Sequence, residues 1–400
     1  MNSSTIQPWQ DVNFNGVIYD CDSLLALFEN LTDPRHAHGK RYSLSTLLVI
    51  ILLAKLCGEN TPIEIADWAK HHAEELVKLL NLKHSWMPHH NTIRRVFANI
   101  LDEAEFERLV RDFHQSKADA GDQLAIDGKA LRGTRIPDEK KADLVLSVYD
   151  VQQQRVLAQE AVDCKENEIV AAPKAIGRVK VAGKVITGDA MHAQRAISAQ
   201  IVAQGGDYLW VVKENQGRLY QDIEQLFTPD KPQPGLGNVP KDFQQAQKVN
   251  GGHGRIETRS IQTSAMLNDY VDWPGIGQVY RLERTIKWRR KGKIVRTSHE
   301  IEYGISSLSR EKASAKRVLQ IRRKHWLIET GLHYRRDVTF REDATRMTQE
   351  GSARKLSLFH DLALGLLKTA GYQNAAAGRR YYKWHVSQAF DLLVTGNHPS

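Results

Sequence analysis

A change of hydrophobic pattern near residue 122 constrains the fold of this chain most strongly. Three short apolar or alternating runs, LAIDGKAL, DLVLSVYDVQ and RVLAQEAVD, follow one another with brief polar links, which is typical of antiparallel strands. Helix-like NEIVAAPKAIGRV comes next, and the strand-like runs KVITGD and DYLWVVK then alternate with helical stretches. Three strands followed by alternating helices and strands predict an α/β fold with helices packed on a mixed sheet.

The segment before this change, from about residue 22 to 118, reads as helices. Its apolar residues recur at three- to four-residue spacing, and Thr61 and Asn91 are candidate N-caps. The longest apolar run, residues 47–54, is far shorter than the ~20 residues that a membrane span needs, so we interpret it as a buried helix. Residues 1–118 are therefore predicted to form an N-terminal helical domain.

One part of this domain is a candidate DNA-reading element. The stretch MPHHNTIRRVFANI resembles a turn followed by a helix that carries Arg94 and Arg95 in its first turns. Many purely structural helices share that pattern, so it is weak support for DNA binding.

The second half of the chain divides at a proline-rich stretch. Four of the twelve prolines lie between residues 229 and 240, which indicates an inserted loop or boundary. Strand-like runs return from about 245 to 307, and residues 314–336 predict one long helix with Ser314 as its N-cap. We expect a catalytic core in two parts, residues 119–228 and residues 313–370. Residues 229–312 would form a β-rich insertion between these parts, and residues 371–400 would form a tail of unknown role.

Positive charge is concentrated in one segment of the chain. The net charge is +9, but residues 281–325 alone hold fifteen Lys and Arg against four Asp and Glu. Such a segment is typical of a surface that binds a phosphate backbone, although a solvated lysine-rich surface is the alternative. The interleaved indole favours nucleic acid, because indoles stack on bases. The candidate DNA contacts here are Lys287, Trp288, Arg289, Arg290 and Lys291.

Cysteine usage and the N-terminal residues predict a cytoplasmic location. Cys21, Cys57 and Cys164 are far apart and form no CxxC pair, which argues against a disulfide framework and a thiolate zinc site. The first fifteen residues have neither a basic start nor a hydrophobic stretch, so we expect no secretory signal.

Three carboxylates are candidates for one active site. Asp127 ends the first apolar run, Asp189 ends the run KVITG, and Glu329 lies within the predicted long helix. Groups at the carboxyl ends of strands converge in open sheets with helical connections. Three clustered carboxylates are costly unless a cation neutralises them, and oxygen ligands suit two Mg²⁺ ions, or Mn²⁺ in their place.

The predicted helix surrounds Glu329 with cationic groups. Residues four and seven positions away share its face, which predicts DNA phosphate contacts by Arg322, His325, His333 and Arg336. Lys129 and Arg132 are candidates for contacting the cleaved strand.

Each carboxylate also has a simpler interpretation. Asp127 and Gly128 are a strong turn signal between two short strands, and Asp189 is a plausible helix N-cap. Glu329 is a candidate salt-bridge partner of its cationic neighbours, and Glu342 and Asp343 are competing acids. No GxGxxG motif occurs, which argues against a nucleotide cofactor.

Several motifs in order resemble the DDE transposases of bacterial insertion sequences, in their H-repeat-associated, Rhs-linked branch. The matching stretches are LAIDGKALRG, KENEI, ITGDAMHAQ, GGDYLWVVKENQ, GHGRIETRS and HWLIETGLHYRRDVTFREDATR. The resemblance implies a ribonuclease H-like core with a β insertion before its last catalytic helix. It also places the three catalytic acids of the family at Asp127, Asp189 and Glu329.

The resemblance therefore predicts a transposase. We expect it to bind element ends, to hydrolyse a DNA strand with metal ions, and to join the freed 3′-hydroxyl to target DNA, working as a dimer or larger assembly. Two alternatives remain open: a nuclease with the same core that no longer transposes, and a retired element that acts only by binding DNA.

Overall fold

The computed structural model describes residues 11–14, 17–36, 38, 40–116, 121–136, 138, 141–162, 167–229, 240–252, 254–291 and 293–395. Three features of the sequence lie outside this part of the chain: Cys164, most of the proline-rich stretch at 230–239, and the start of the KENEI motif at 165 and 166. Cys21 and Cys57 are free thiols. No helix among the described residues has both the length and the apolar character needed to cross a membrane.

The N-terminal part is helical, as predicted, after a short hairpin of β1 (Asp11–Phe14) and β2 (Val17–Asp20). Its helices are α1 (Leu24–Glu29), α2 (Leu44–Leu56), α3 (Pro62–His71), α4 (Ala73–Leu79), α5 (His90–Arg95) with the π-helical turn η1 (Val96–Ile100), and α6 (Glu103–Ser116).

The long apolar run forms α2, which is buried on every side. A helix that is apolar all round can be stable only inside a core, which is where the other helices place it. The predicted cap Thr61 precedes α3 with a complete capping box. The Thr61 side chain accepts a hydrogen bond from the Glu64 backbone N–H, and the Glu64 side chain accepts one from the Thr61 backbone N–H. The predicted cap Asn91 is wrong by two residues, because His89 caps α5.

Nine strands form one mixed sheet in the order β5-β4-β3-β6-β7-β11-β10-β9-β8. In its first half, β3 runs antiparallel to β4 and parallel to β6, and β6 runs parallel to β7. This order, with the first strand in the middle, is the ribonuclease H-like arrangement that the sequence predicted. The bounds are β3 (Gln123–Leu131), β4 (Asp143–Asp150), β5 (Arg155–Val162), β6 (Val185–Gly188) and β7 (Asp207–Val212).

Alternate residues of the strands face two different cores. Leu124 and Ile126 of β3 pack with one set of helices, α7 (Glu168–Gly177), α8 (Arg195–Ala203) and α9 (Gly217–Phe227). Ala125 faces the opposite side, where the N-terminal helices pack. Because side chains alternate along a strand, Asp127 lies on the same side as Ala125. Short 3₁₀ turns, η2 (Arg132–Thr134) and η3 (Glu214–Gln216), follow β3 and β7.

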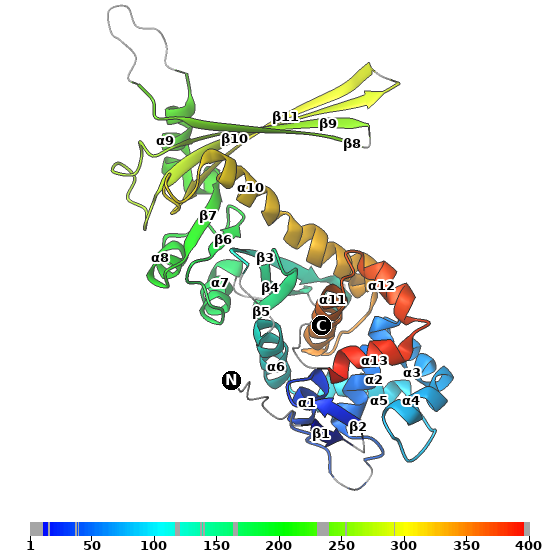
Figure 1. Cartoon of the computed structure of the whole chain (residues 1–400). Helices are drawn as coiled ribbons and strands as arrows, with labels where there is room; N and C mark the ends of the chain where they lie inside the picture. Colours follow the sequence, from blue (N-terminus) through cyan, green and yellow to red (C-terminus); the bar gives the residue numbers. More distant parts are fainter. Residues whose placement is uncertain are drawn as a thin grey trace, which may run out of the picture.

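The expected β insertion continues the core sheet. Its strands are β8 (Gln244–Gly252), β9 (Arg255–Ser264), β10 (Gln278–Arg290) and β11 (Lys293–Ser306). The last four residues of β11 pair antiparallel with β7, from Tyr303 opposite Val212 to Ser306 opposite Leu209. The far ends of β10 and β11 project as a long twisted ribbon (Figure 1).

The predicted helix over 314–336 is present, but it is not a regular α-helix. It begins as α10 (Ala315–His325) after Ser314 and continues as two π-helical turns, η4 (Glu329–His333) and η5 (Arg335–Thr339). Figure 1 shows α10 running from the β8–β11 ribbon toward the N-terminal helices. π-Turns insert an extra residue and often occur at functional sites.

The C-terminal segment, which the sequence left without a role, completes the N-terminal core. After the 3₁₀ turn η6 (Glu342–Ala344), helices α11 (Ser352–Thr369), α12 (Ala375–Tyr382) and α13 (Val386–Val394) return to the N-terminal part. Phe359 and Phe390 belong to the same hydrophobic cluster as the residues of α2. Figure 1 shows α13 beside α1 and α2. The described N-terminal helices and the helices α11 to α13 are thus packed into one core.

Candidate active site

Asp127 lies inside a strand and not at a turn. Strand β3 continues four residues beyond Asp127 to Leu131, and its pairing with β4 places Asp127 opposite Ser147. The alternative of a hairpin turn at Asp127 and Gly128 is therefore wrong, and so is the expectation that the strand ends at Asp127. The carboxylate faces the side of the sheet on which the helix with Glu329 packs, because it contacts that helix directly.

Asp189 follows the neighbouring parallel strand. Ala125 of β3 pairs with Thr187 of β6, so Asp127 and Asp189 each come two residues after this pair. Adjacent strands are roughly 4.8 Å apart, which brings the two backbones close together. The simpler interpretation of Asp189 as a helix N-cap is wrong, because α8 begins at Arg195 and Gln194 occupies its N-cap position.

The Asp189 carboxylate is held by its own loop. Oδ1 accepts hydrogen bonds from the Met191 backbone N–H at 2.9 Å and from His192 Nδ1 at 2.9 Å. Burial opposes ionisation of Asp189, but these bonds outweigh it and lower the pKa of Asp189. Asp189 is therefore an anion at neutral pH.

Glu329 begins the first π-turn and reaches Asp127. The two carboxyl groups lie close together, and with His333 they form a group whose ligand atoms all lie within 4.8 Å of one another. Burial raises the pKa of Glu329; the hydrogen bond and charge of Asp127 add to this rise, while His333 opposes it. For Asp127, burial is outweighed by the bonds to His333 and Glu329, so its pKa is lowered. The opposite directions of these two pKa shifts mean that Glu329 takes up a proton more readily than Asp127.

Two histidines that were predicted to contact DNA phosphates lie within the active site instead. His333 is buried, and its Nε2 lies 3.2 Å from Asp127 Oδ2. His325 is also buried, with Nδ1 3.1 Å from the Thr187 hydroxyl. Burial, helped by Arg322, lowers the pKa of His325 to about 4 against the attraction of Asp127 and Asp189, so this imidazole is neutral. Both histidines are positioned to orient the acids, which corrects the expectation that they face solvent and DNA.

Three predicted DNA contacts are engaged in ion pairs. Arg322 donates from Nε and Nη2 to Glu302 at 2.6 and 2.7 Å, and Arg336 is fully buried with Glu342 at 2.9 to 3.0 Å. Lys129 is 7% exposed and lies 2.7 Å from Asp337 and 3.1 Å from Asp343. We revise the expectation for all three, because buried and paired cations are not presented to a phosphate backbone.

The same ion pairs exclude the two competing candidates for the third catalytic acid. Glu342 is held by Arg336 and by His360 Nδ1 at 2.8 Å, and Asp343 is held by Lys129. Burial opposes ionisation of Glu342, but Arg336 and His360 outweigh it and hold the pKa of Glu342 well below its usual range. Neither acid is left to bind a cation beside Asp127.

Glu168 is a fourth acid near the site, which the sequence reasoning did not select. It begins α7, and the pKa of its carboxyl is raised by burial and by Asp127 and Asp189, against the effect of His192. Its only signal in the sequence is its place in the KENEI motif.

The donor set fits a hard divalent cation. Asp127 and Glu329 offer carboxylate oxygens that lie close together, and Asp189 follows the neighbouring strand; carboxylate oxygens are the ligands that Mg²⁺ and Mn²⁺ prefer. The close approach of Asp127 and Glu329 supports this fit, because a cation between two carboxylates relieves their mutual repulsion.

The exposed cations gather elsewhere. Arg132 is 78% exposed just after β3, and Lys287, Arg289, Arg290 and Lys291 are exposed at the far end of the β10–β11 ribbon. Trp288 is half-buried there, with the Arg296 guanidinium stacked 4.8 Å from its ring centre. Their role as DNA contacts stays a prediction.

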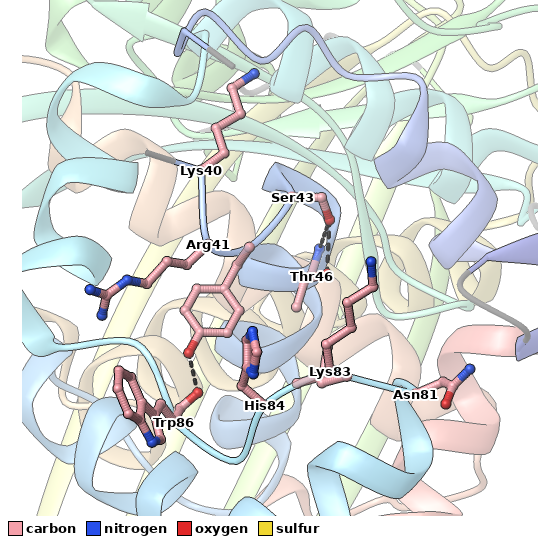
Figure 2. A pocket seen from close by; sticks show the side chains of 10 residues that line it. Lys40, Arg41, Ser43, Thr46, Asn81, Lys83, His84 and Trp86 are labelled. Atoms are coloured by element: carbon pink, nitrogen blue, oxygen red, sulfur yellow. Dashed lines mark hydrogen bonds between the residues drawn. The ribbon is translucent and has the colours of Figure 1, made fainter. Parts of the chain in front are cut away.

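A second basic surface lies at the start of α2. A cavity of about 990 Å³ lies there, and the Tyr42 hydroxyl, which lines it, donates a hydrogen bond to the Trp86 carbonyl. Figure 2 shows Trp86, whose indole is exposed, together with Arg41. Arg41 lies 5.7 Å from the ring centre of this indole. No carboxylate lines the cavity within the described part of the chain; its lining residues are Lys40, Arg41, Tyr42, Ser43, Thr46, Asn81, Leu82, Lys83, His84 and Trp86.

Comparison with known proteins identifies the family. The family profile described as "Transposase DDE domain" matches residues 120–364, and one described as "DDE_Tnp_1-associated" matches residues 25–114. YncI of Escherichia coli O157:H7 is 30% identical over 353 residues, which is 86% of this chain and 87% of YncI. YhhI of Escherichia coli K12, whose name provisionally describes it as an H repeat-associated transposase, is 29% identical over 88% of this chain and 92% of YhhI.

A solved structure is also similar over most of the chain. The piggyBac transposase synaptic complex with hairpin DNA matches 92% of this chain and 78% of that chain at 11% identity and a TM-score of 0.47. The DDE profile alone covers more than half of the 400 residues, and it contains all three predicted acids. The chain therefore belongs to the family of transposases with a DDE domain.

Proposed function

We propose that this protein hydrolyses a phosphodiester bond at the ends of a mobile DNA element and then joins the freed 3′-hydroxyl to target DNA. The observation that carries the proposal is the contact of Asp127 with Glu329 beside Asp189, on one face of a ribonuclease H-like sheet. Membership of the DDE transposase family supports it.

In this proposal Asp127, Asp189 and Glu329 hold two Mg²⁺ ions, or Mn²⁺ in their place. Such ions, when bound, activate the attacking hydroxyl and stabilise the leaving oxygen. Asp127 and Glu329 would both be ionised as ligands of these cations. His333, whose Nε2 lies 3.2 Å from Asp127 Oδ2, helps to orient Asp127, and neutral His325 adds no charge that would compete with the cations.

The attacking groups are water in the cleavage step and the 3′-hydroxyl in the joining step. No side chain of the chain is therefore expected to form a covalent bond with DNA. Arg132 directly follows the strand that carries Asp127 and is exposed, so in this proposal it contacts the cleaved DNA strand.

Two separate surfaces are proposed to hold the DNA outside the active site. One is the ribbon end formed by Lys287, Arg289, Arg290 and Lys291, where the exposed cations suit a phosphate backbone. The other is the cavity at the start of α2, where the exposed Trp86 indole suits stacking on a base. Because an element has two ends, we propose a dimer or larger assembly in the DNA complex.

The test is metal-dependent cleavage and joining of DNA that carries the sequences flanking the reading frame. We expect wild-type protein to produce free 3′-ends and joined products with Mg²⁺ or Mn²⁺, and Asp127→Asn and Glu329→Gln to lose both by at least a hundredfold. Glu311→Gln, which changes an exposed carboxylate before α10, is the control. Free ends that are never joined would favour a nuclease, and DNA binding without cleavage would favour a retired element.

A further inference from the structure

The loop after Asp189 and the start of α7 place an imidazole between two carboxylates. His192 is fully buried, and its Nδ1 lies 2.9 Å from Asp189 Oδ1. On the other side of the ring, His192 Nε2 lies 3.5 Å from Glu168 Oε2. The ring therefore connects Glu168 to one of the proposed cation ligands.

Glu168 lies next to the backbone of the other acid strand. Its carboxylate occupies the space beside Gly128, so a methyl group added at that glycine would overlap Oε1. Gly128 directly follows Asp127, and the absence of a side chain there is what lets Glu168 approach. The φ angle of Gly128 is not positive, so this glycine is required for space and not for backbone conformation.

Two atoms of this arrangement have no hydrogen-bond partner. Glu168 is 9% exposed and His192 is 0% exposed, yet Glu168 Oε2 and His192 Nε2 form no hydrogen bond with any described residue. A buried polar atom without a partner is destabilising, so a purely structural role is a poor explanation for this pair. A small movement that closes the 3.5 Å separation would satisfy both atoms at once.

The bonds to Asp189 leave one oxygen available. Oδ1 accepts from His192 and from the Met191 backbone, whereas Oδ2 accepts no hydrogen bond from the residues that the structure describes. An imidazole that is itself oriented by a carboxylate is a common way to hold a group in a metal site. Here the imidazole acts on a carboxylate ligand and not directly on the ion.

We propose that Glu168 is a positioning residue of the active site, which holds His192 so that its Nδ1 keeps Asp189 oriented with Oδ2 toward the cations. The proposal rests on the proposed function and adds a fourth acid to it. Glu168 acts through His192 and is not itself a cation ligand, which separates it from Asp127, Asp189 and Glu329.

The first experiment measures Mn²⁺ binding to the full-length protein without DNA, by titration calorimetry. Glu168→Gln and His192→Ala are each expected to weaken Mn²⁺ binding roughly 10-fold or more, as for other groups that orient metal ligands. The double variant should be no weaker than His192→Ala, because Glu168 has no effect once the ring is gone. Losses that multiply in the double variant would overturn the proposal and make Glu168 a direct ligand.

Two further variants separate positioning from folding. His192→Asn keeps an N–H donor near the place of Nδ1, so it should retain more Mn²⁺ affinity than His192→Ala. Glu107→Gln changes a glutamate of similar burial on α6, paired with Arg111, and should leave Mn²⁺ binding unchanged. Equal losses in His192→Asn and His192→Ala, or a loss in Glu107→Gln, would show that the effect is general destabilisation.

The contact with Gly128 gives an independent test. Gly128→Ala should displace the Glu168 carboxylate and weaken Mn²⁺ binding as Glu168→Gln does, but it should add little in a Glu168→Ala background. Full Mn²⁺ affinity in Gly128→Ala would contradict the inference.

The proposed function and this inference fail in different ways. Loss of Mn²⁺ binding in Asp127→Asn but not in Glu168→Gln would refute only the role of Glu168. Wild-type protein that binds no Mn²⁺ would refute the cation site itself.

Discussion

Glu342 and Glu329 are close in sequence but are expected to respond in opposite ways to the same substitution. Glu342 is fully enclosed; it accepts hydrogen bonds from Arg336 Nε at 3.0 Å and from His360 Nδ1 at 2.8 Å, and Arg336 Nη2 lies 2.9 Å from it as an ion-pair partner. Glu342→Gln removes the charge that balances Arg336, whose nearest other acid is Asp361 at 3.9 Å. Breaking one side of a buried ion pair costs about 3–5 kcal/mol, which is the expected loss in free energy of unfolding.

Glu329→Gln should leave the protein as stable as before or slightly more stable. The pKa of Glu329 is raised in the folded state, so ionising it at neutral pH costs free energy that glutamine does not. The assay is urea unfolding followed by tryptophan fluorescence at pH 7, together with metal-dependent DNA cleavage. We expect Glu342→Gln to be destabilised but able to cleave below its unfolding transition, and Glu329→Gln to be stable and inactive.

The pH dependence adds a second measurement on Glu342. Its pKa is depressed in the folded state, so its contribution is present above the unfolded value near 4.5 and is lost as pH falls below it. The stability difference between wild type and Glu342→Gln should therefore shrink between pH 5 and pH 3. If Glu342→Gln had wild-type stability and did not cleave DNA, while Glu329→Gln still cleaved it, Glu342 would be the catalytic acid and our assignment would be wrong.

Three other expectations concern the core and the DNA surfaces. Burial raises the pKa of Asp361 to about 7 against the attraction of Arg336, so ionisation of Asp361 destabilises the fold increasingly from pH 4 to 7. The stability of Asp361→Asn relative to wild type, measured by thermal unfolding, should therefore increase over that range, and a difference that stays constant with pH would contradict this. Trp86→Ala should weaken DNA binding in fluorescence anisotropy by roughly 1–3 kcal/mol, whereas Trp384→Ala, an exposed tryptophan that does not line the cavity, should not. Reversing the charges of Arg289 and Arg290 should make the negative slope of log affinity against log salt concentration less steep by about 2. An unchanged slope would exclude phosphate contacts by these two residues.

The local sequence pattern was sufficient to predict most helices and strands. Strand-like runs around Asp127 and Asp189 became β3 and β6, and Thr61 capped its helix, because period and capping act over a few residues. Local signals also misled where a longer-range contact decided. Asp127 and Gly128 are a turn signal in isolation, but pairing with β4 keeps that segment extended.

The helix with Glu329 shows why the set of DNA contacts had to be revised. A regular 3.6-residue period placed Arg322, His325, His333 and Arg336 on one face, but the two π-turns change the number of residues per turn between them. The face that carries Glu329 packs against β3 and β6, so His325 and His333 lie beside Thr187 and Asp127, and Arg336 is buried against Glu342. No pattern in the sequence marked the π-turns in advance.

The sequence by itself determined the order of strands and helices, the acids that follow or lie in two central strands, and the position of the basic segment. These depend on residue type and on spacing within a single element. The tertiary structure alone decided that β11 extends the core sheet, that α12 and α13 close the N-terminal core, and that Glu168 fits beside Gly128. Each of these is a contact between distant residues, which depends on strand register and side-chain packing, and local periodicity carries no information about either.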